Sequence, residues 1–250
     1  MDTTVLLGFL LLVILGCLIQ TLSGFAIALV ITGGMTSLGL VPITFTVNVV
    51  SIVSLANVVT ALHGKLAEVD GIMFRYAGAG IVAMSGGGLL VLNYLSQNSV
   101  RILELFLGVV ILVSAAVFVR PPRLNKKKSS NTMHFLAGGM GGFLSGMFGA
   151  GGPPIVLHVY RQPLPLIELR STLLAIVGVM TSTRLGMEAL AQHVSWDMLR
   201  TGLICIPVSM LATMLGRRLR PCISDRVVRN FSAILLCIIG GNLFIRAWFA

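Results

Sequence analysis

The sequence predicts an all-α polytopic membrane protein built from two inverted repeats, each with a broken, re-entrant helical segment and three transmembrane helices. Three observations lead to this class. Of the 250 residues, 56% are hydrophobic and 10% are charged, whereas about 25% are charged in a soluble domain. Apolar stretches long enough to cross a bilayer recur along almost the whole chain. Two of these stretches contain a break of small residues, at corresponding points of the two halves.

The two breaks are related by a nearly constant offset in the sequence. The first lies in GCLIQTLSGFAIALVITGG, residues 16–34, and the second in GGFLSGMFGAGGPPIVLHV, residues 141–159. Aligning Gln20 with Gly146, an offset of 126, places residues 23–26 opposite residues 149–152. Paired breaks of this kind indicate a transporter binding site near the bilayer midplane. Broken helices persist in lipid only where protein or a watery cavity satisfies the freed backbone groups.

Each half supplies one broken segment followed by three full spans. We expect them at residues 4–38, 43–62, 71–93 and 101–119 in the first half, and at 134–159, 171–190, 199–217 and 230–248 in the second. The first repeat is residues 1–120, a proline-containing basic linker is 121–133, and the second repeat is 134–250. Gly88 lies opposite Gly216, and Arg101 opposite Arg229, at an offset of 128. The ordered landmarks indicate a duplication.

The distribution of basic residues selects the topology. If each broken segment crosses once, the 18 Lys and Arg residues divide 10 to 8, which is no bias. If each returns to its own side, all but Arg101, Arg184, Arg200 and Arg246 share one side, a split of 14 to 4. Because basic residues mark the cytoplasmic side, we expect a cytoplasmic linker and both termini outside. Tyr94, Trp196 and Trp248 then fall at the outer interface. The start of the chain has no basic region, so we interpret it as the first membrane segment and not a cleaved signal.

Composition excludes several other classes of protein. The net charge of +10 comes from residues between apolar segments, where membrane topology and anionic lipid explain it without nucleic acid. The four cysteines form no CxxC pair, and the histidines form no HxxxH pair. We therefore expect no metal site and no cofactor, and we expect the cysteines to pack as small apolar residues.

The breaks supply the first set of candidate binding residues. Gly149, Gly151 and Gly152 allow a sharp turn and close approach to a ligand, and the two prolines that follow suit the first turn of a new helix. A helix N-terminus inside the membrane attracts anions. Gln20, Ser23 and Gly24 are the corresponding candidates of the first half. The alternative is close helix packing through small residues, as in the Gly142–Gly146 pair.

The span after each break supplies the second set. Asn48 and Ser51 are polar residues in a segment of lipid-spanning length, and a buried amide needs a partner. Arg170 and Ser171 stand just after the second break, where an arginine can hold an oxyanion with two hydrogen bonds or simply mark the cytoplasmic side. Arg184 and Glu188 form an i,i+4 pair. Every carboxylate lies near a predicted span end, which argues against a cation transporter.

These segments resemble the TauE/SafE family of sulfite and organosulfur-anion exporters over essentially the whole chain. GGFLSGMFGAGGPPIVLHVY (141–160) is similar to the glycine-rich signature of that family, and IELRSTLLAI contains its Arg170–Ser171 pair. IQTLSGFAIALV (19–30) resembles the first-half version, with Ala26 in place of the second glycine. The resemblance implies secondary transport of small, often sulfur-containing anions.

The sequence thus predicts a multi-pass inner-membrane transporter whose partners are a small anionic substrate and the lipid bilayer. A channel or a non-transporting membrane scaffold is the alternative function. An intramembrane enzyme is disfavoured, because GGFLSG is not a GxSG motif and no histidine base is placed to activate its serine.

Overall fold

The computed structural model describes residues 3–39, 41–119, 124–192, 195–219 and 224–249, and this part of the chain is helical without a strand. The first half contains α1 (Thr3–Ser23), α2 (Ile27–Leu38), α3 (Ile43–Leu62), the short 3₁₀ helix η1 (Leu66–Glu68), α4 (Gly71–Asn98) and α5 (Val100–Val119). The second half contains α6 (Asn131–Phe148), α7 (Gly152–Tyr160), α8 (Leu166–Leu190), α9 (Trp196–Leu219) and α10 (Asp225–Phe249).

Seven of the described helices are long and apolar enough to cross a membrane, namely α1, α3, α4, α5, α8, α9 and α10. All three full spans expected in each half are among them, so the all-helical membrane class is confirmed. Both predicted breaks are also present, between α1 and α2 and between α6 and α7. An unbroken helix over residues 4–38 would be about 52 Å long, which exceeds a hydrocarbon core of about 30 Å.

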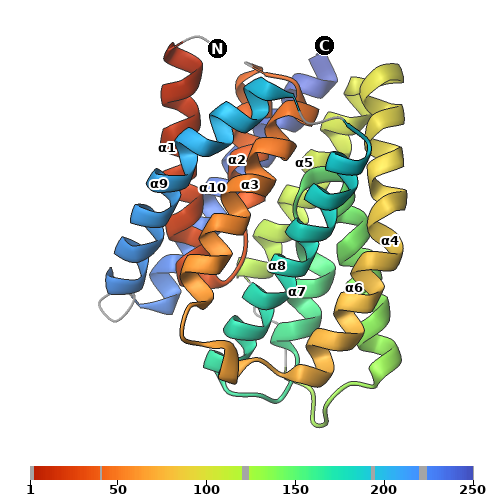
Figure 1. Ribbon diagram of the computed structural model, residues 1–250, viewed down its shortest axis with the longest axis vertical. Helices are drawn as coiled ribbons and strands as arrows, with labels where there is room; N and C mark the ends of the chain where they lie inside the picture. The colour runs from red at the N-terminus through yellow and green to blue at the C-terminus, as the bar shows by residue number, and fades with distance from the viewer. Residues whose placement is uncertain (1–2, 40, 120–123, 193–194, 220–223, 250) are drawn as a thin grey trace.

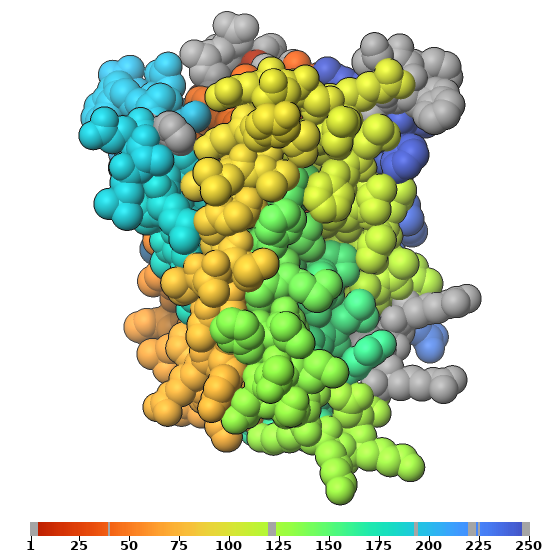
Figure 2. Space-filling model, turned by 90° about the vertical axis from the view of Figure 1, so that its right-hand side faces the viewer, coloured from red at the N-terminus to blue at the C-terminus, as the bar shows by residue number. Residues whose placement is uncertain are grey.

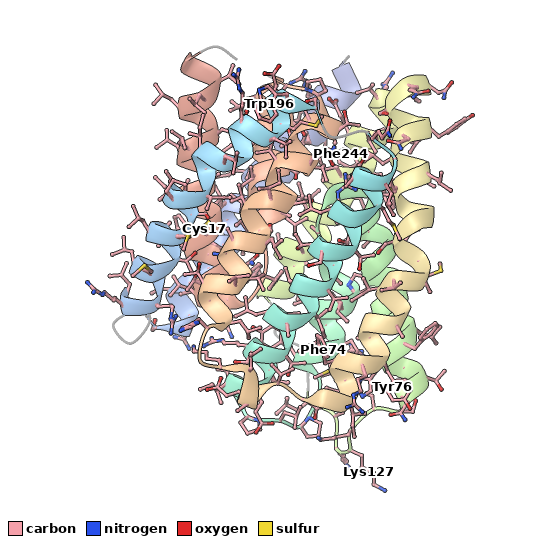
Figure 3. All side chains as sticks on the ribbon, viewed as in Figure 1. Cys17, Phe74, Tyr76, Lys127, Trp196 and Phe244 are labelled. Atoms are coloured by element: carbon pink, nitrogen blue, oxygen red, sulfur yellow. The ribbon has the colours of Figure 1, made fainter. Side chains whose placement is uncertain are left out.

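The helices run along the long axis of the molecule, with both marked chain ends at one end of the bundle (Figure 1). Lys127 of the linker lies at the opposite end, whereas Trp196 lies near the chain ends (Figure 3). In each half the short second arm, α2 or α7, turns back toward the end at which the first arm begins (Figure 1). The broken segments are therefore hairpins, the shape expected of a re-entrant segment. The sides on which the termini and the linker lie stay a prediction.

Glycines allow α4 and α6 to approach very closely, and the two helices lie side by side over one face of the molecule (Figure 2). A Cβ added at Gly80 would meet the carbonyl oxygen of Phe135, and one at Gly146 would meet that of Ser85. At Gly142 a Cβ would stand 2.6 Å from the Cα of Ile81. The Gly142–Gly146 pair is thus a packing feature, which was the alternative interpretation of small residues in this segment.

The two halves repeat one packing relation. Gly88 of α4 faces Phe143 and Met147 of α6, and Gly216 of α9 faces Leu18 and Thr21 of α1. Gly88 and Gly216 are the pair aligned by sequence, and Thr21 aligns with Met147 at the offset of 126. This equivalence supports the duplication, while the inverted relation of the halves and the division at residues 121–133 stay predictions.

Two of the three predicted interface aromatics are exposed, Tyr94 at 67% and Trp196 at 65%. The side chain of Trp248 lies outside the described residues, as do Arg120, Arg123, Arg220 and Cys222. Large exposed apolar side chains, such as Leu11, Leu90 and Ile234, lie along the outward faces of the helices. Such a surface suits contact with lipid tails.

Candidate functional site

Positive φ angles make both breaks. Gly24 (φ 88°) and Ala26 (φ 93°) turn the chain from α1 into α2, and Gly149 (φ 70°) and Gly152 (φ 59°) turn it from α6 into α7. Gly151 has φ −66°, so it is not needed for the turn. A Cβ there would collide with the end of the Met180 side chain, so this glycine permits close packing.

Each half of the molecule donates a hydrogen bond to a backbone carbonyl group that the break leaves without a helical partner in the other half. The hydroxyl of Tyr160, at the end of α7, donates to the carbonyl oxygen of Ser23 at 2.5 Å. The hydroxyl of Thr32 in α2 donates to the carbonyl oxygen of Phe148 at 3.4 Å. Because the last carbonyls of a helix have no partner within the helix, these bonds allow both breaks to persist away from water.

Gln20 holds the first break together. Its Oε1 accepts a hydrogen bond from the N–H of Ile27, the first residue of α2, at 3.3 Å. Its Nε2 donates to Asn57 Oδ1 at 2.8 Å, and Asn57 Nδ2 donates to Thr213 Oγ1 at 2.6 Å. The Gln20 side chain thus acts as a cap for α2 and connects α1, α3 and α9.

The two breaks meet at a small cavity of about 20 Å³, lined by Gln20, by residues 25–29 and by residues 149–152. A cavity of this size holds one water molecule. Ser54 of α3 also lines it and is 1% exposed, and its hydroxyl has no hydrogen-bond partner. A buried hydroxyl without a partner is costly, so Ser54 is a candidate ligand of whatever enters this cavity.

A larger cavity of about 240 Å³ lies beside the first break. It is lined by the ends of α1, α3 and α9 and by the start of α8, and these helix ends lie at the linker end of the bundle (Figure 1). Three cationic side chains from different elements line it: Lys65, Arg170 and Arg217. Gly24 and Ser171 line it as well. A Cβ added at Gly24 would lie 3.8 Å from Arg170 Cγ, so the break and the guanidinium-bearing side chain are neighbours.

One carboxylate lies beside this cationic cavity. Glu68 Oε2 accepts a hydrogen bond from the hydroxyl of Ser171 at 2.6 Å. The groups named here give three positive charges and one negative charge at this cavity. Such an excess attracts a small anion, and guanidinium groups match the oxygen edge of a sulfonate, sulfite or carboxylate.

A third cavity, of about 380 Å³, is also lined by Arg170. Its walls are mostly apolar, from Phe25, Phe118 and Leu169 among others, and Ser23, Tyr160 and Arg229 add polar groups. The Ser23 hydroxyl lies 2.7 Å from the carbonyl oxygen of Ile19 and 2.9 Å from that of Phe25. The Ser23 hydroxyl therefore hydrogen-bonds to the backbone at the first break.

A buried ion pair stands nearer the other end of α8. Arg184 is 1% exposed, and its guanidinium lies 3.0 Å from Glu188 Oε1 and 2.9 Å from Asn48 Oδ1. It also donates to the carbonyl oxygen of Gly146, near the end of α6. Asn48 thus has its amide partner within the protein. Glu188 lies near the end of α8, as expected of every carboxylate, but its side chain is only 3% exposed. The paired arginine compensates its charge, so Glu188 is not a ready cation ligand.

The structure divides the predicted site residues into four groups. Gln20, Gly149, Gly151 and Gly152 line the cavity between the breaks, and Gly24, Arg170 and Ser171 line the cationic cavity. Ser23 joins Arg170 in the apolar cavity. Asn48 and Ser51 line none of the three, and the hydroxyl of Ser51 donates to the carbonyl oxygen of Val47 at 2.8 Å.

Several polar lining residues were not among the candidates that the sequence suggested, including Lys65, Arg217, Ser54 and Tyr160. A cationic cluster drawn from three separate helices and loops leaves no local signal in the chain. For Tyr160, its position at the end of the second break was the available clue.

Comparison with known proteins identifies the family. Residues 9–243 match the family model described as sulfite exporter TauE/SafE. A relative from Cupriavidus necator, named probable sulfite/organosulfonate exporter TauE, is 36% identical over 242 residues, which cover 97% of this chain and 94% of that protein. A relative from Comamonas testosteroni, named probable inner membrane transporter protein TsaS, is 25% identical over 190 residues, 75% of this chain and 78% of that protein. No solved structure matches the chain. The protein belongs to the TauE/SafE sulfite exporter family, whose members are membrane transporters and not enzymes.

Proposed function

We propose that this protein is a secondary transporter that exports a small sulfur-containing oxyanion, such as sulfite or a sulfonate, across the inner membrane. The observation that carries the proposal is the cavity below the first break, where Lys65, Arg170 and Arg217 converge. The names of the two relatives, a sulfite/organosulfonate exporter and an inner membrane transporter, agree with this substrate class and location.

The arrangement of cavities favours alternating access. Both larger cavities lie at the linker end, which we propose is cytoplasmic, while the Arg184–Glu188 pair packs the region toward the other end. Between these regions, the cavity at the breaks holds only about 20 Å³. The structure then corresponds to an inward-facing state in which the anion reaches Arg170 from the cytoplasm.

The same narrow point disfavours a channel, which needs a continuous pathway. A scaffold without transport activity does not explain why three cations from separate elements line one cavity. We propose that the two breaks separate during transport and that the N–H groups at the start of α7 then contact the anion.

Substrate-dependent thermal stabilisation of the purified protein tests this proposal. Sulfite, sulfate, methanesulfonate and acetate are compared with choline as its chloride, each at matched ionic strength. A ligand at 100 times its Kd stabilises the folded state by about 2.7 kcal/mol. We expect a concentration-dependent rise in Tm with a sulfur oxyanion and none with choline. Stabilisation by the cation alone would contradict the anion assignment.

A further inference from the structure

A pair of histidines joins the two arms of the second broken segment. His134 of α6 and His158 of α7 stand with Nδ1 and Nε2 2.7 Å apart, and their rings meet edge to face at a centroid distance of 4.9 Å. His134 is 4% exposed. We propose that this pair binds the proton that couples to anion transport, an inference that rests on the proposed function.

The geometry limits the pair to one added proton. Only one of the two facing nitrogens carries a hydrogen, because two N–H groups at this distance would oppose each other. One further proton makes one ring an imidazolium and strengthens the bond by charge assistance. A second would place two N–H groups and two positive charges face to face. The pair therefore titrates as a unit that accepts a single charge.

Burial has the largest effect on both rings and opposes a positive charge there. Three charged groups act on the pair from the elements around it. Asp70, the N-cap of α4, favours a positive charge on His134, while Lys128 of the linker opposes it. Arg161, which follows α7, opposes a positive charge on His158. Burial by itself raises the pKa of Asp70, but hydrogen bonds from Lys128 and from the N–H of Met73, with the charge of Lys128, hold that pKa below its ordinary value. Asp70 therefore stays ionised beside the pair at neutral pH.

The pair is connected to the anion pathway through α7. His158 lies in the same short helix as Tyr160, whose hydroxyl caps α1 at Ser23 and lines the apolar cavity beside Arg170. Gln162 ties the carbonyl of His158 to Ser129 of the linker through its Nε2. Adding charge between α6 and α7 thus acts on the element that holds the first break in place. Since Glu188 is already paired with Arg184, the histidine pair is the better proton carrier of the two.

The test uses full-length protein reconstituted in liposomes that contain a pH-sensitive dye. Methanesulfonate is the probe, because it does not titrate near neutral pH. We expect a methanesulfonate gradient to move protons in the wild type. The double variant His134→Asn, His158→Gln retains amides at the positions of the facing nitrogens but cannot take a proton. It should lose the proton movement and still exchange labelled methanesulfonate. His63→Gln, an exposed histidine at the end of α3, is the control and should behave as the wild type.

The outcomes separate the two proposals. Wild-type exchange of methanesulfonate without proton movement, or proton movement that survives in the double variant, would overturn the histidine pair and leave anion transport standing. No movement of any tested sulfur oxyanion would overturn both. Histidine NMR of the wild type gives a second readout that does not depend on transport or on the folding of a variant. It should show one protonation shared by the two rings, and two independent titrations would refute the pair.

Discussion

Arg170 lines both larger cavities and neighbours the glycine of the first break. A charge-assisted hydrogen bond contributes about 1.5–3 kcal/mol. We therefore expect Arg170→Ala to weaken anion binding about tenfold to a hundredfold, since 1.4 kcal/mol is about tenfold. Arg170→Lys keeps the charge but loses the planar fork, so its loss should be smaller. Thermal stabilisation titrated with sulfite or methanesulfonate measures both, and affinity unchanged in Arg170→Ala would reduce Arg170 to a topology marker.

Ala26 is a residue-scale source of strain. Its φ of 93° lies in the left-handed region, where the Cβ of an L residue is crowded. We expect Ala26→Gly to raise the free energy of unfolding by roughly 0.5–1 kcal/mol. The matched control is Ala115→Gly, a buried alanine within α5, which should lower it by about 0.5–1 kcal/mol. Thermal unfolding in detergent measures whether each variant has a higher or lower Tm than the wild type. A lower Tm for Ala26→Gly would show that packing of the buried methyl group of Ala26 outweighs the strain.

At the scale of elements, the contact between α4 and α6 depends on absent side chains. Gly80 of α4 meets the backbone of Phe135 and Gly139, whereas the nearest atom to a Cβ at Gly78 is Val179 Cγ1 at 3.9 Å. Gly80→Ala should destabilise the protein by about 1–3 kcal/mol through overpacking. Gly78→Ala, on the same helix, should be neutral or stabilising by up to about 1 kcal/mol. Equal Tm values for the two variants would show that α4 and α6 can move apart to accommodate the added methyl group without loss of stability.

The whole molecule carries the topological prediction. Both chain ends lie at one end of the bundle and the basic linker at the other (Figure 1), and 14 of 18 basic residues share the linker side in the re-entrant topology. We expect an alkaline-phosphatase fusion at residue 250 to be active and a fluorescent-protein fusion there to be dark. A fusion after Lys127 should give the opposite pair of signals. A fluorescent C-terminus without phosphatase activity would contradict the outside placement of the ends.

The sequence by itself determined the class and the element plan. A long apolar stretch predicts a membrane-spanning helix, because in lipid the backbone N–H and C=O groups of a single segment can find hydrogen-bond partners only within a helix. The glycines at 24 and 149 mark the breaks because a turn with positive φ suits that residue. The family followed from the same segments, and the match over residues 9–243 confirmed it. These features depend on residues close together in the sequence, so they can be predicted from the sequence directly.

Only the tertiary structure decided which of the candidate residues share a cavity. Lys65, Arg170 and Arg217 come from the region after α3, from α8 and from α9, and they converge only because those elements meet at the linker end. Asn48 appeared to be a free polar group until the fold brought it to Arg184, for which the sequence indicated only Glu188 as a partner. Gln20 became a helix cap because α2 folds back against α1. When two partners lie far apart in the sequence, no local pattern shows that they will meet. Only the packing of the folded chain therefore decides whether a buried polar side chain forms a structural hydrogen bond or lines a binding site.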